Sequence, residues 1–293
     1  MIIYQQTGRE YKGNLHLHTT GSDGRRSPED AVRAYGEAGY DFLALTDHRK
    51  VTSLPGYTGP VTLLKGLELD ENLALGECIH LVGVGVSDSI MPQVRQGMPS
   101  KEALNLIHAH GGLCYLAHPH WSMNTLATLR GLEGLDGAEI YNGFSGPPYN
   151  PLRAEATQLL DLAAMEGRFL PTIATDDTHY YEGELFSGFI LAQADSSSER
   201  DIMAALRAGR YYASSGPRFE SVSLEGDEVK VACSPVRHII FHSNLPWNGG
   251  RVTTGEGVRE GSYRLNRAWG ERFVRVVLED MEGRRAWLNP FLV

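Results

Sequence analysis

Histidine and carboxylate residues recur after apolar runs through the first two thirds of the chain, in a spacing that suits metal binding. His16 and His18 form an H-x-H pair, and Asp177 and His179 form a D-x-H pair. Because alternate side chains of a strand point to the same face, each pair presents two ligand atoms on one side. Single residues of the same kind are His48, Glu68, His80 and His118. Imidazole and carboxylate together predict a borderline divalent metal such as zinc, manganese or iron.

The number of candidate ligands predicts more than one ion. Six histidines and the carboxylates that accompany them in these runs are more than a single ion can use. We therefore expect two or three divalent metal ions close together. Such clusters hydrolyse esters and phosphoesters through a metal-bound hydroxide, while the ions neutralise charge on the reacting oxygens.

Alternating strand and helix patterns position these residues. Each candidate ligand follows or ends an apolar run, and Ser27-Pro28 supplies a helix start between the first two runs. The expected strands cover residues 13–19, 41–48, 61–69, 78–86, 113–118, 138–142, 169–175 and 186–193. The expected helices cover residues 27–39, 100–110, 151–166 and 198–209. This α/β alternation predicts a parallel barrel or a doubly wound sheet with its site at the carboxyl ends of the strands.

The pattern changes after residue 216. Short β-type runs follow at residues 222–224, 229–232, 238–242 and 273–278, with turn signals such as Asn248-Gly249-Gly250 and without a helical periodicity. We expect two domains, a metallohydrolase barrel over residues 1–216 and a small β-sandwich-like all-β domain over residues 217–293.

The metal motifs resemble those of the PHP (polymerase and histidinol phosphatase) family over residues 11–216. The resemblance implies a distorted seven-stranded (β/α) barrel. It also implies nine ligands, which are His16, His18, Asp23, His48, Glu68, His80, His118, Asp177 and His179. In the family, one metal takes the positions of His16, His18, Glu68 and Asp177. A second takes those of Glu68, His80 and His118, so that Glu68 bridges, and a third takes those of Asp23, His48 and His179.

Further segments look like the carbaryl-hydrolase-like branch of that family. They are Ser22-Asp23-Gly24, the doubled acid before Thr178, the run 209–217 and the ending 286–293. This likeness constrains the expected fold more than the expected reaction and substrate.

Two side chains are candidate catalytic residues by position. His120 follows His118 by two residues, so it can share its face and donate a proton to a leaving group. Arg49 follows His48 and could clamp a phosphoryl group, because a guanidinium pairs bidentately with phosphoryl oxygens. A polar residue that only supports the site is the alternative for His120.

Composition limits the classes of partner and compartment. The chain has 293 residues and a formal net charge of −9, so binding of nucleic acid or an anionic membrane over its surface is not expected. The three cysteines are odd in number and lack C-x-x-C spacing, which indicates free thiols. We find no signal peptide and no apolar stretch long enough to span a membrane, so we expect a cytoplasmic protein.

We predict a metal-dependent phosphoesterase that cleaves a small phosphorylated metabolite or nucleotide. The first alternative is hydrolysis of a carboxylic ester or carbamate at the same site, which would tolerate loss of Arg49. A further alternative is processing of nucleic-acid ends, but the negative net charge of the chain argues against it. The alternative of another class is a binding protein with structural metals, whose β domain would bind a carbohydrate or a partner. Its candidate contacts are Trp247, Trp269 and Trp287, although we expect at least two of them to pack in the core. No oligomeric state is predicted.

Overall fold

The computed structural model describes residues 1–293 as a mixed α/β fold. The α-helices are α1 (Pro28–Glu37), α2 (Ser100–Ala109), α3 (Leu126–Gly131), α4 (Thr157–Met165) and α5 (Glu199–Arg207). Short 3-10 turns are η1 (Ala74–Gly76), η2 (Asp88–Gln93), η3 (Gly143–Ser145) and η4 (Arg267–Trp269). None of these helices has the length and apolar character needed to cross a membrane.

Sixteen strands form one continuous hydrogen-bonded sheet. In the first part of the chain they are β1 (Ile2–Gln5), β2 (Tyr11–Asn14), β3 (Phe42–Leu45), β4 (Thr62–Asn72), β5 (Cys78–Val84), β6 (Leu113–Leu116), β7 (Gly137–Asn142), β8 (Thr172–Thr175), β9 (Phe189–Ala192) and β10 (Tyr211–Ser214). The later strands are β11 (Phe219–Glu225), β12 (Glu228–Ser243), β13 (Val252–Arg264), β14 (Phe273–Glu279), β15 (Arg285–Trp287) and β16 (Phe291–Leu292).

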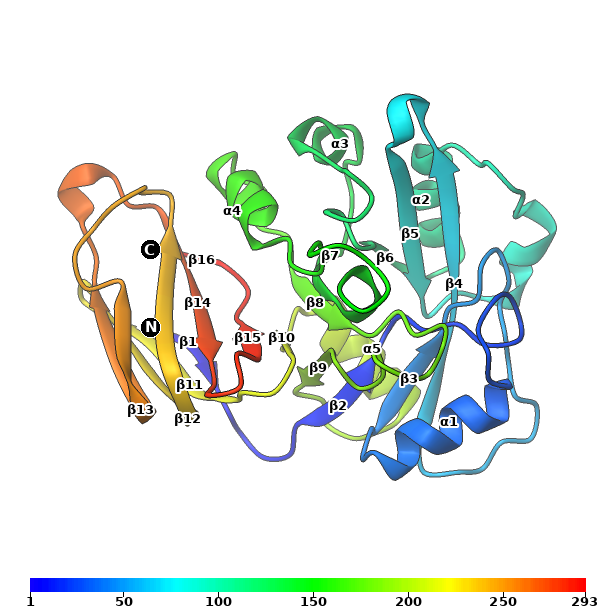
Figure 1. Ribbon diagram of the computed structural model, residues 1–293, viewed down its shortest axis with the longest axis horizontal. Coiled ribbons are helices and arrows are strands. Elements are labelled where there is room, and N and C mark those ends of the chain that lie inside the picture. The colour runs from blue at the N-terminus through cyan, green and yellow to red at the C-terminus, as the bar shows by residue number, and fades with distance from the viewer.

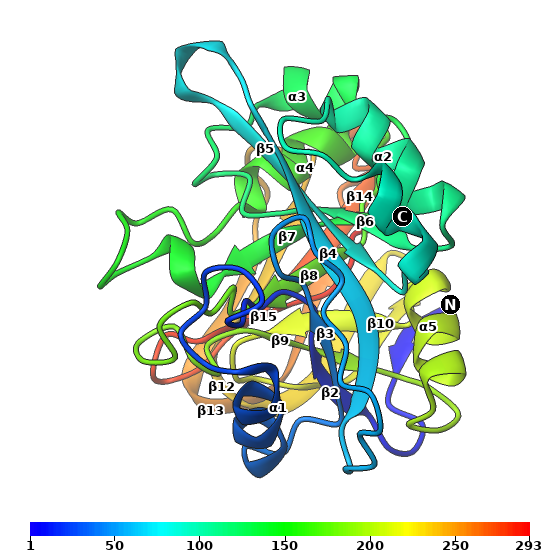
Figure 2. The same ribbon diagram turned by 90° about the vertical axis from the view of Figure 1, so that its right-hand side faces the viewer.

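Strands β2 to β8 lie side by side in chain order and carry the predicted metal ligands. The pairs β2–β3, β3–β4, β6–β7 and β7–β8 are parallel, whereas β5 runs antiparallel to both of its neighbours. Strands β4 and β5 form a long hairpin that projects from the body of the molecule (Figure 2). Glu68 and His80 therefore lie within a hairpin rather than at the carboxyl ends of two parallel strands.

The two outermost strands of this series, β2 and β8, are connected near the site only through an isolated bridge between the segments that follow them. Leu17, which follows β2, bridges Thr178, which follows β8. The backbone N–H of His18 also donates to Thr178 O at 3.0 Å. No ladder pairs β8 with β2 or β9, so the closed seven-stranded barrel stays a prediction.

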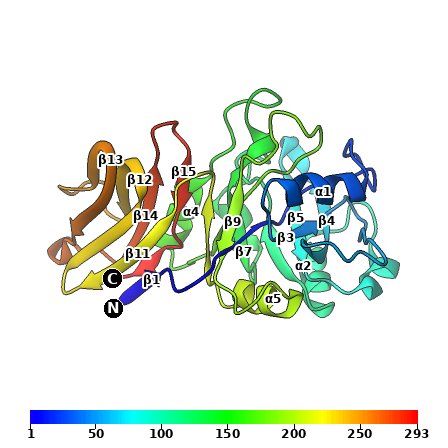
Figure 3. The same cartoon turned by 90° about the horizontal axis from the view of Figure 1, so that it is seen from below.

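Residues 219–293, which we call the C-terminal β region, contain strands and one 3-10 turn and no α-helix. Strand β1, from the other end of the chain, pairs antiparallel with β11. Strand β15 links this region to β10, so the sheet continues into the helical part. Both chain termini lie in this region, away from α1 and α2 (Figures 1 and 3).

Several elements differ from their expected ranges. The helix expected over 151–166 begins only at Thr157, because Glu155 bridges Tyr141 and keeps the preceding backbone extended. The runs Val229–Ala232 and His238–His242 belong to one long strand, β12. Strand β13 was not expected, since it pairs with β12 alone and its exposed, glycine-containing sequence lacks an apolar run.

Candidate metal centre

The structure brings all nine predicted ligands together. They fall into four overlapping groups, and within each group the candidate ligand atoms lie within 4.8 Å of one another. The groups are His18, Asp23, His48 and His179; His16, His18 and Glu68; His16, His118 and Asp177; and Glu68, His80 and His118. We call these nine residues the metal cluster. The pairing of the chain after β2 with the chain after β8 explains why the H-x-H and D-x-H pairs meet.

Four atoms at the deepest point are separated by distances of ligand length in five of their six pairs. The Nε2 atoms of His16 and His18 lie 3.2 Å apart, and each lies 3.2 Å from Asp177 Oδ1. They lie 3.4 and 3.2 Å from Glu68 Oε2. Ligand atoms bound at about 2.0–2.1 Å from one tetrahedral ion would be about 3.3 Å from each other. His16 and His18 therefore lie at ligand spacing from both carboxylates, as a shared zinc-like ion would require.

Glu68 faces imidazoles with both of its oxygens. Its Oε2 also lies 3.1 Å from His48 Nδ1. Its Oε1 lies 2.7 Å from His80 Nδ1 and 3.3 Å from His118 Nε2. A carboxylate with different nitrogen donors on each oxygen is placed to bridge two ions.

The third set of ligands lies at the rim of the cluster. Asp23 Oδ2 is 3.6 Å from His48 Nε2 and 3.6 Å from His179 Nε2. The Asp23 side chain is 53% exposed, whereas that of Glu68 is 1% exposed. An ion held here would be the most accessible to water.

The electrostatics of the cluster favour cations. Burial alone would raise the pKa of Glu68, but His16, His48 and His80 hold it well below its usual range. Burial alone would lower the pKa of His18, yet hydrogen bonds to Asp177 and Glu68 raise it to about 9. Two fully buried carboxylates thus face imidazoles rather than lysine or arginine. Divalent ions can supply the positive charge that protons otherwise supply here.

Glu139, within β7, is a residue that sequence reasoning missed. Its Oε1 accepts from His16 Nδ1 at 2.8 Å and from Thr175 Oγ1 at 2.6 Å, and its Oε2 accepts from the His118 N–H at 2.6 Å. Asn142 Nδ2 donates both to Glu139 Oε2 at 2.7 Å and to Asp177 Oδ2 at 3.2 Å. Because His16 donates through Nδ1, its Nε2 is left as the ligand atom. The sequence feature that could have identified Glu139 is that it is an acidic residue between the apolar residues Ala138 and Ile140, all three of which are buried.

Asp47 organises the loop that carries Asp23. It accepts hydrogen bonds from the backbone N–H and the hydroxyl of Thr19, both at 2.7 Å, and from those of Ser22 at 3.0 and 2.8 Å. Burial alone would raise the pKa of Asp47, but hydrogen bonds from Thr52 and Thr19 lower it. The loop is thereby tied to the end of β3, next to His48.

Two ligands sit on left-handed backbone. His118 has a φ of 27° and Asp177 a φ of 51°. Such conformations are rare for residues other than glycine and cost on the order of 1–3 kcal/mol each. They occur where the chain leaves β6 and β8 and turns each side chain toward the cluster.

A cavity of about 190 Å³ opens above the metal cluster. Besides ligands, its walls are Trp121, Phe144 and Ser145. The Phe144 ring stacks on His179 with centroids 4.5 Å apart. Trp121 Nε1 donates to Asn150 Oδ1 at 2.8 Å, which fixes its ring beside His118. Substrate access is therefore bordered by aromatic rings.

The two candidate catalytic residues lie outside this cavity lining. Arg49 forms an ion pair with Asp70, and its backbone N–H donates to Glu68 O at 2.7 Å. His120 lines a different cleft, beside α4. His118 and Trp121 line the metal cavity, so the chain around residue 120 separates the two spaces.

Similarity to a solved two-domain protein agrees with a PHP-like fold. No family model matches the chain. A two-domain protein from Bacteroides vulgatus, containing a predicted PHP-like metal-dependent phosphoesterase, is similar over 100% of this chain and 98% of its own, with 17% identity and a TM-score of 0.55. An amidohydrolase from Chromobacterium violaceum, solved with bound sulfate, covers 67% of this chain and 96% of its own, with 15% identity and a TM-score of 0.48.

One curated relative matches part of the sequence. A 5'-3' exoribonuclease of Haemophilus influenzae is 34% identical over 99 residues, or 32% of this chain. The matched stretch spans 35% of that relative's length.

Proposed function

We propose that the protein is a metal-dependent phosphoesterase acting on a small phosphorylated molecule. The observation that carries the proposal is the metal cluster, in which two buried carboxylates each face several imidazoles at ligand spacing. The proposed ligands are the nine residues of the cluster, and the proposed cofactors are two or three divalent ions. The proposed metallohydrolase part is residues 1–216, with residues 217–293 as a separate β domain.

Ions bound by the cluster would activate water and neutralise charge on phosphoryl oxygens. The chain itself would orient the ligands, since Glu139 and Asn142 hold His16 and Asp177 in place. Trp121 and Phe144 would border the substrate and limit water around it. The likenesses to a predicted phosphoesterase and to an exoribonuclease are consistent with phosphoester chemistry.

A carboxylic ester or carbamate is the second candidate substrate class. The observation that favours it is the absence of lysine and arginine from the cavity lining, because Arg49 is already paired with Asp70. A phosphomonoester dianion would then depend on the metal ions alone for its charge balance. The branch resemblance allows the same hydrolytic site to act on an uncharged ester.

The test is an assay of purified protein loaded with manganese, zinc or iron against phosphomonoesters, phosphodiesters and carboxylic esters. We expect metal-dependent phosphate release that Asp177→Ala abolishes. The matched control is Asp88→Ala, which removes an exposed carboxylate paired with Lys65. Ester cleavage without phosphate release would support the second candidate. Bound metal with no turnover on any substrate would contradict both.

A further inference from the structure

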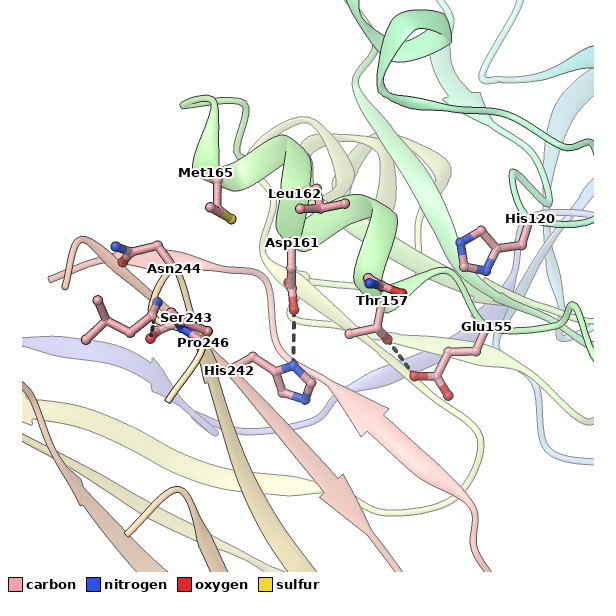
Figure 4. A pocket seen from close by; sticks show the side chains of 12 residues that line it. His120, Glu155, Thr157, Asp161, Leu162, Met165, His242, Ser243, Asn244 and Pro246 are labelled. Carbon is pink, nitrogen blue, oxygen red and sulfur yellow. Dashed lines mark hydrogen bonds and ion pairs between the residues drawn. The ribbon is translucent and has the colours of Figure 1, made fainter. Parts of the chain in front are cut away.

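A second, larger cleft lies beside α4, where the helix faces the end of β12. Its volume is about 750 Å³, within the usual range for ligand pockets. Residues 157, 158, 161, 162 and 165 of α4 form one wall, as their three- and four-residue spacing allows. The opposite wall is formed by residues 242–246, and His120 closes one end (Figure 4). We call this space the α4 cleft.

The carboxylates of the α4 cleft are already neutralised. Asp161 Oδ1 accepts from Nε of the fully buried Arg275 at 2.7 Å, and its Oδ2 lies 3.1 Å from His242 Nδ1. Glu155 accepts from Thr157 Oγ1 at 2.6 Å and pairs with Arg285. No group of possible metal ligands occurs in the cleft. These contacts argue against an ionic ligand or a metal.

Several polar groups in the cleft remain free to bind a ligand. His120 and the exposed Gln158 make no side-chain hydrogen bond within the chain. His242 uses Nδ1 for Asp161, so its Nε2 is available. Leu162 and Met165 add apolar surface, being 38% and 41% exposed. The cleft thus offers neutral hydrogen-bonding groups beside apolar surface.

Trp247 directly follows Pro246 of the cleft wall in the chain and is one of two neighbouring exposed tryptophans. Trp247 and Trp269 are 67% and 59% exposed, and their ring centroids lie 6.1 Å apart. Asn244, which lines the cleft, donates through Nδ2 to Gly270 O at 3.0 Å, so the two tryptophan-bearing loops are tied together. Exposed indoles in such proximity mark a binding surface. Trp287, by contrast, is buried and belongs to the core.

We infer that the α4 cleft and this tryptophan pair bind a neutral carbohydrate. A sugar ring offers a C–H face that packs on indole and hydroxyl groups that bond to amide and imidazole side chains. The cleft supplies both kinds of surface and no uncompensated charge. This inference is independent of the hydrolytic reaction at the metal cluster.

The test is titration of the full chain with maltose, cellobiose and lactose at up to about 10 mM, followed by calorimetry and tryptophan fluorescence. We expect saturable binding of at least one sugar and at least a tenfold loss of affinity in Trp269→Ala and Gln158→Ala. Leu75→Ala, which alters an exposed residue outside the cleft, should bind as the parent does. Circular dichroism checks that the variants, all at exposed positions, remain folded.

Three outcomes would overturn the inference. One is the absence of saturable binding to all three sugars. Another is binding that neither Trp269→Ala nor Gln158→Ala weakens. The third is self-association of the chain that Trp247→Ala abolishes, without sugar binding, which would make this surface an interface between copies. None of these results depends on turnover at the metal cluster.

Discussion

The metal cluster and the α4 cleft both pair carboxylates with histidine, but they balance the negative charge differently. In the cluster, Glu68 and Asp177 face several imidazoles and no lysine or arginine. In the α4 cleft, Asp161 faces the buried guanidinium of Arg275 as well as His242. Only the first arrangement leaves a demand for cations. The comparison therefore separates a site for metal chemistry from a charge pair that holds two parts of the fold together.

Loss of the Glu68 carboxylate should have the largest effect. In Glu68→Gln we expect turnover to fall on the order of 1,000-fold or more, since charge stabilisation in the transition state is lost. Steady-state assays with saturating metal measure this effect. Glu102→Gln, which changes an exposed glutamate paired with Arg95, is the control and should keep full activity. Equal activity in the two variants would show that the metal cluster does not take part in the reaction.

Asp161→Asn should affect folding instead of turnover. Leaving the buried Arg275 without its partner should lower the free energy of unfolding by roughly 3–5 kcal/mol at neutral pH. Urea unfolding measures the loss. Activity per folded molecule should stay at the parental value, and a selective loss of turnover would erase the distinction between the two regions.

The pH dependence of that variant follows from the pKa of Asp161. Burial alone would raise this pKa, but Arg275 and His242 lower it. Because the pKa of Asp161 is lower in the folded state than in the unfolded state, its ionised carboxylate stabilises the fold at pH values above the unfolded pKa of about 3.9. This stabilisation is lost as the pH falls through the folded-state pKa. The stability gap between the parent and Asp161→Asn should therefore be constant near pH 7 and narrow below about pH 4.

Glu139→Gln should have an intermediate effect on the metal cluster. It keeps the side-chain volume but weakens the acceptor that orients His16 through Nδ1. Changes to such supporting groups cost roughly 10- to 100-fold in metal affinity or activity. Metal titration with a competing chelator measures the affinity. An unchanged affinity would show that the ligand geometry does not depend on β7.

Asp23→Asn should be the mildest of these changes. Asp23 is the most exposed member of the cluster, and its contacts with His48 and His179 are 3.6 Å long. We expect loss of one ion and a fall in turnover of roughly tenfold or less, or about 1.4 kcal/mol of barrier. Elemental analysis counts the ions. A loss of turnover as large as that of Glu68→Gln would indicate that an ion held by Asp23, His48 and His179 takes part directly in the reaction.

The sequence was most informative where residue type and strand position coincide. Eight of the nine cluster residues could be proposed because each ends or follows an apolar run, whereas Asp23 was proposed from the family resemblance alone. Their assembly follows from neighbouring strands. Long-range pairing was not predictable in the same way. Strand β1 joins β11 from the other end of the chain, and β13 is a polar strand that pairs only with β12.

The directions of two side chains, those of His120 and Glu139, could not be predicted from the sequence. His120 was expected to share a face with His118, but the chain turns at His118, where φ is 27°, and the strand alternation ends. His120 consequently lines the α4 cleft. Glu139 was not singled out because a lone acid in a strand carries no spacing signal, although four groups bond to it. Its role depends on contacts between β7, β8 and the chain after β2.

Counting the ions bound by the parent and by Glu68→Gln tests the central claim most directly. Metal-loaded protein, dialysed and analysed for manganese, zinc and iron, should hold two or three ions per chain. Glu68→Gln should lose two of them, because this carboxylate faces ligands of two sets, while Glu102→Gln should retain the parental number. An unchanged ion count in Glu68→Gln, or a parent that binds no ion, would contradict the account.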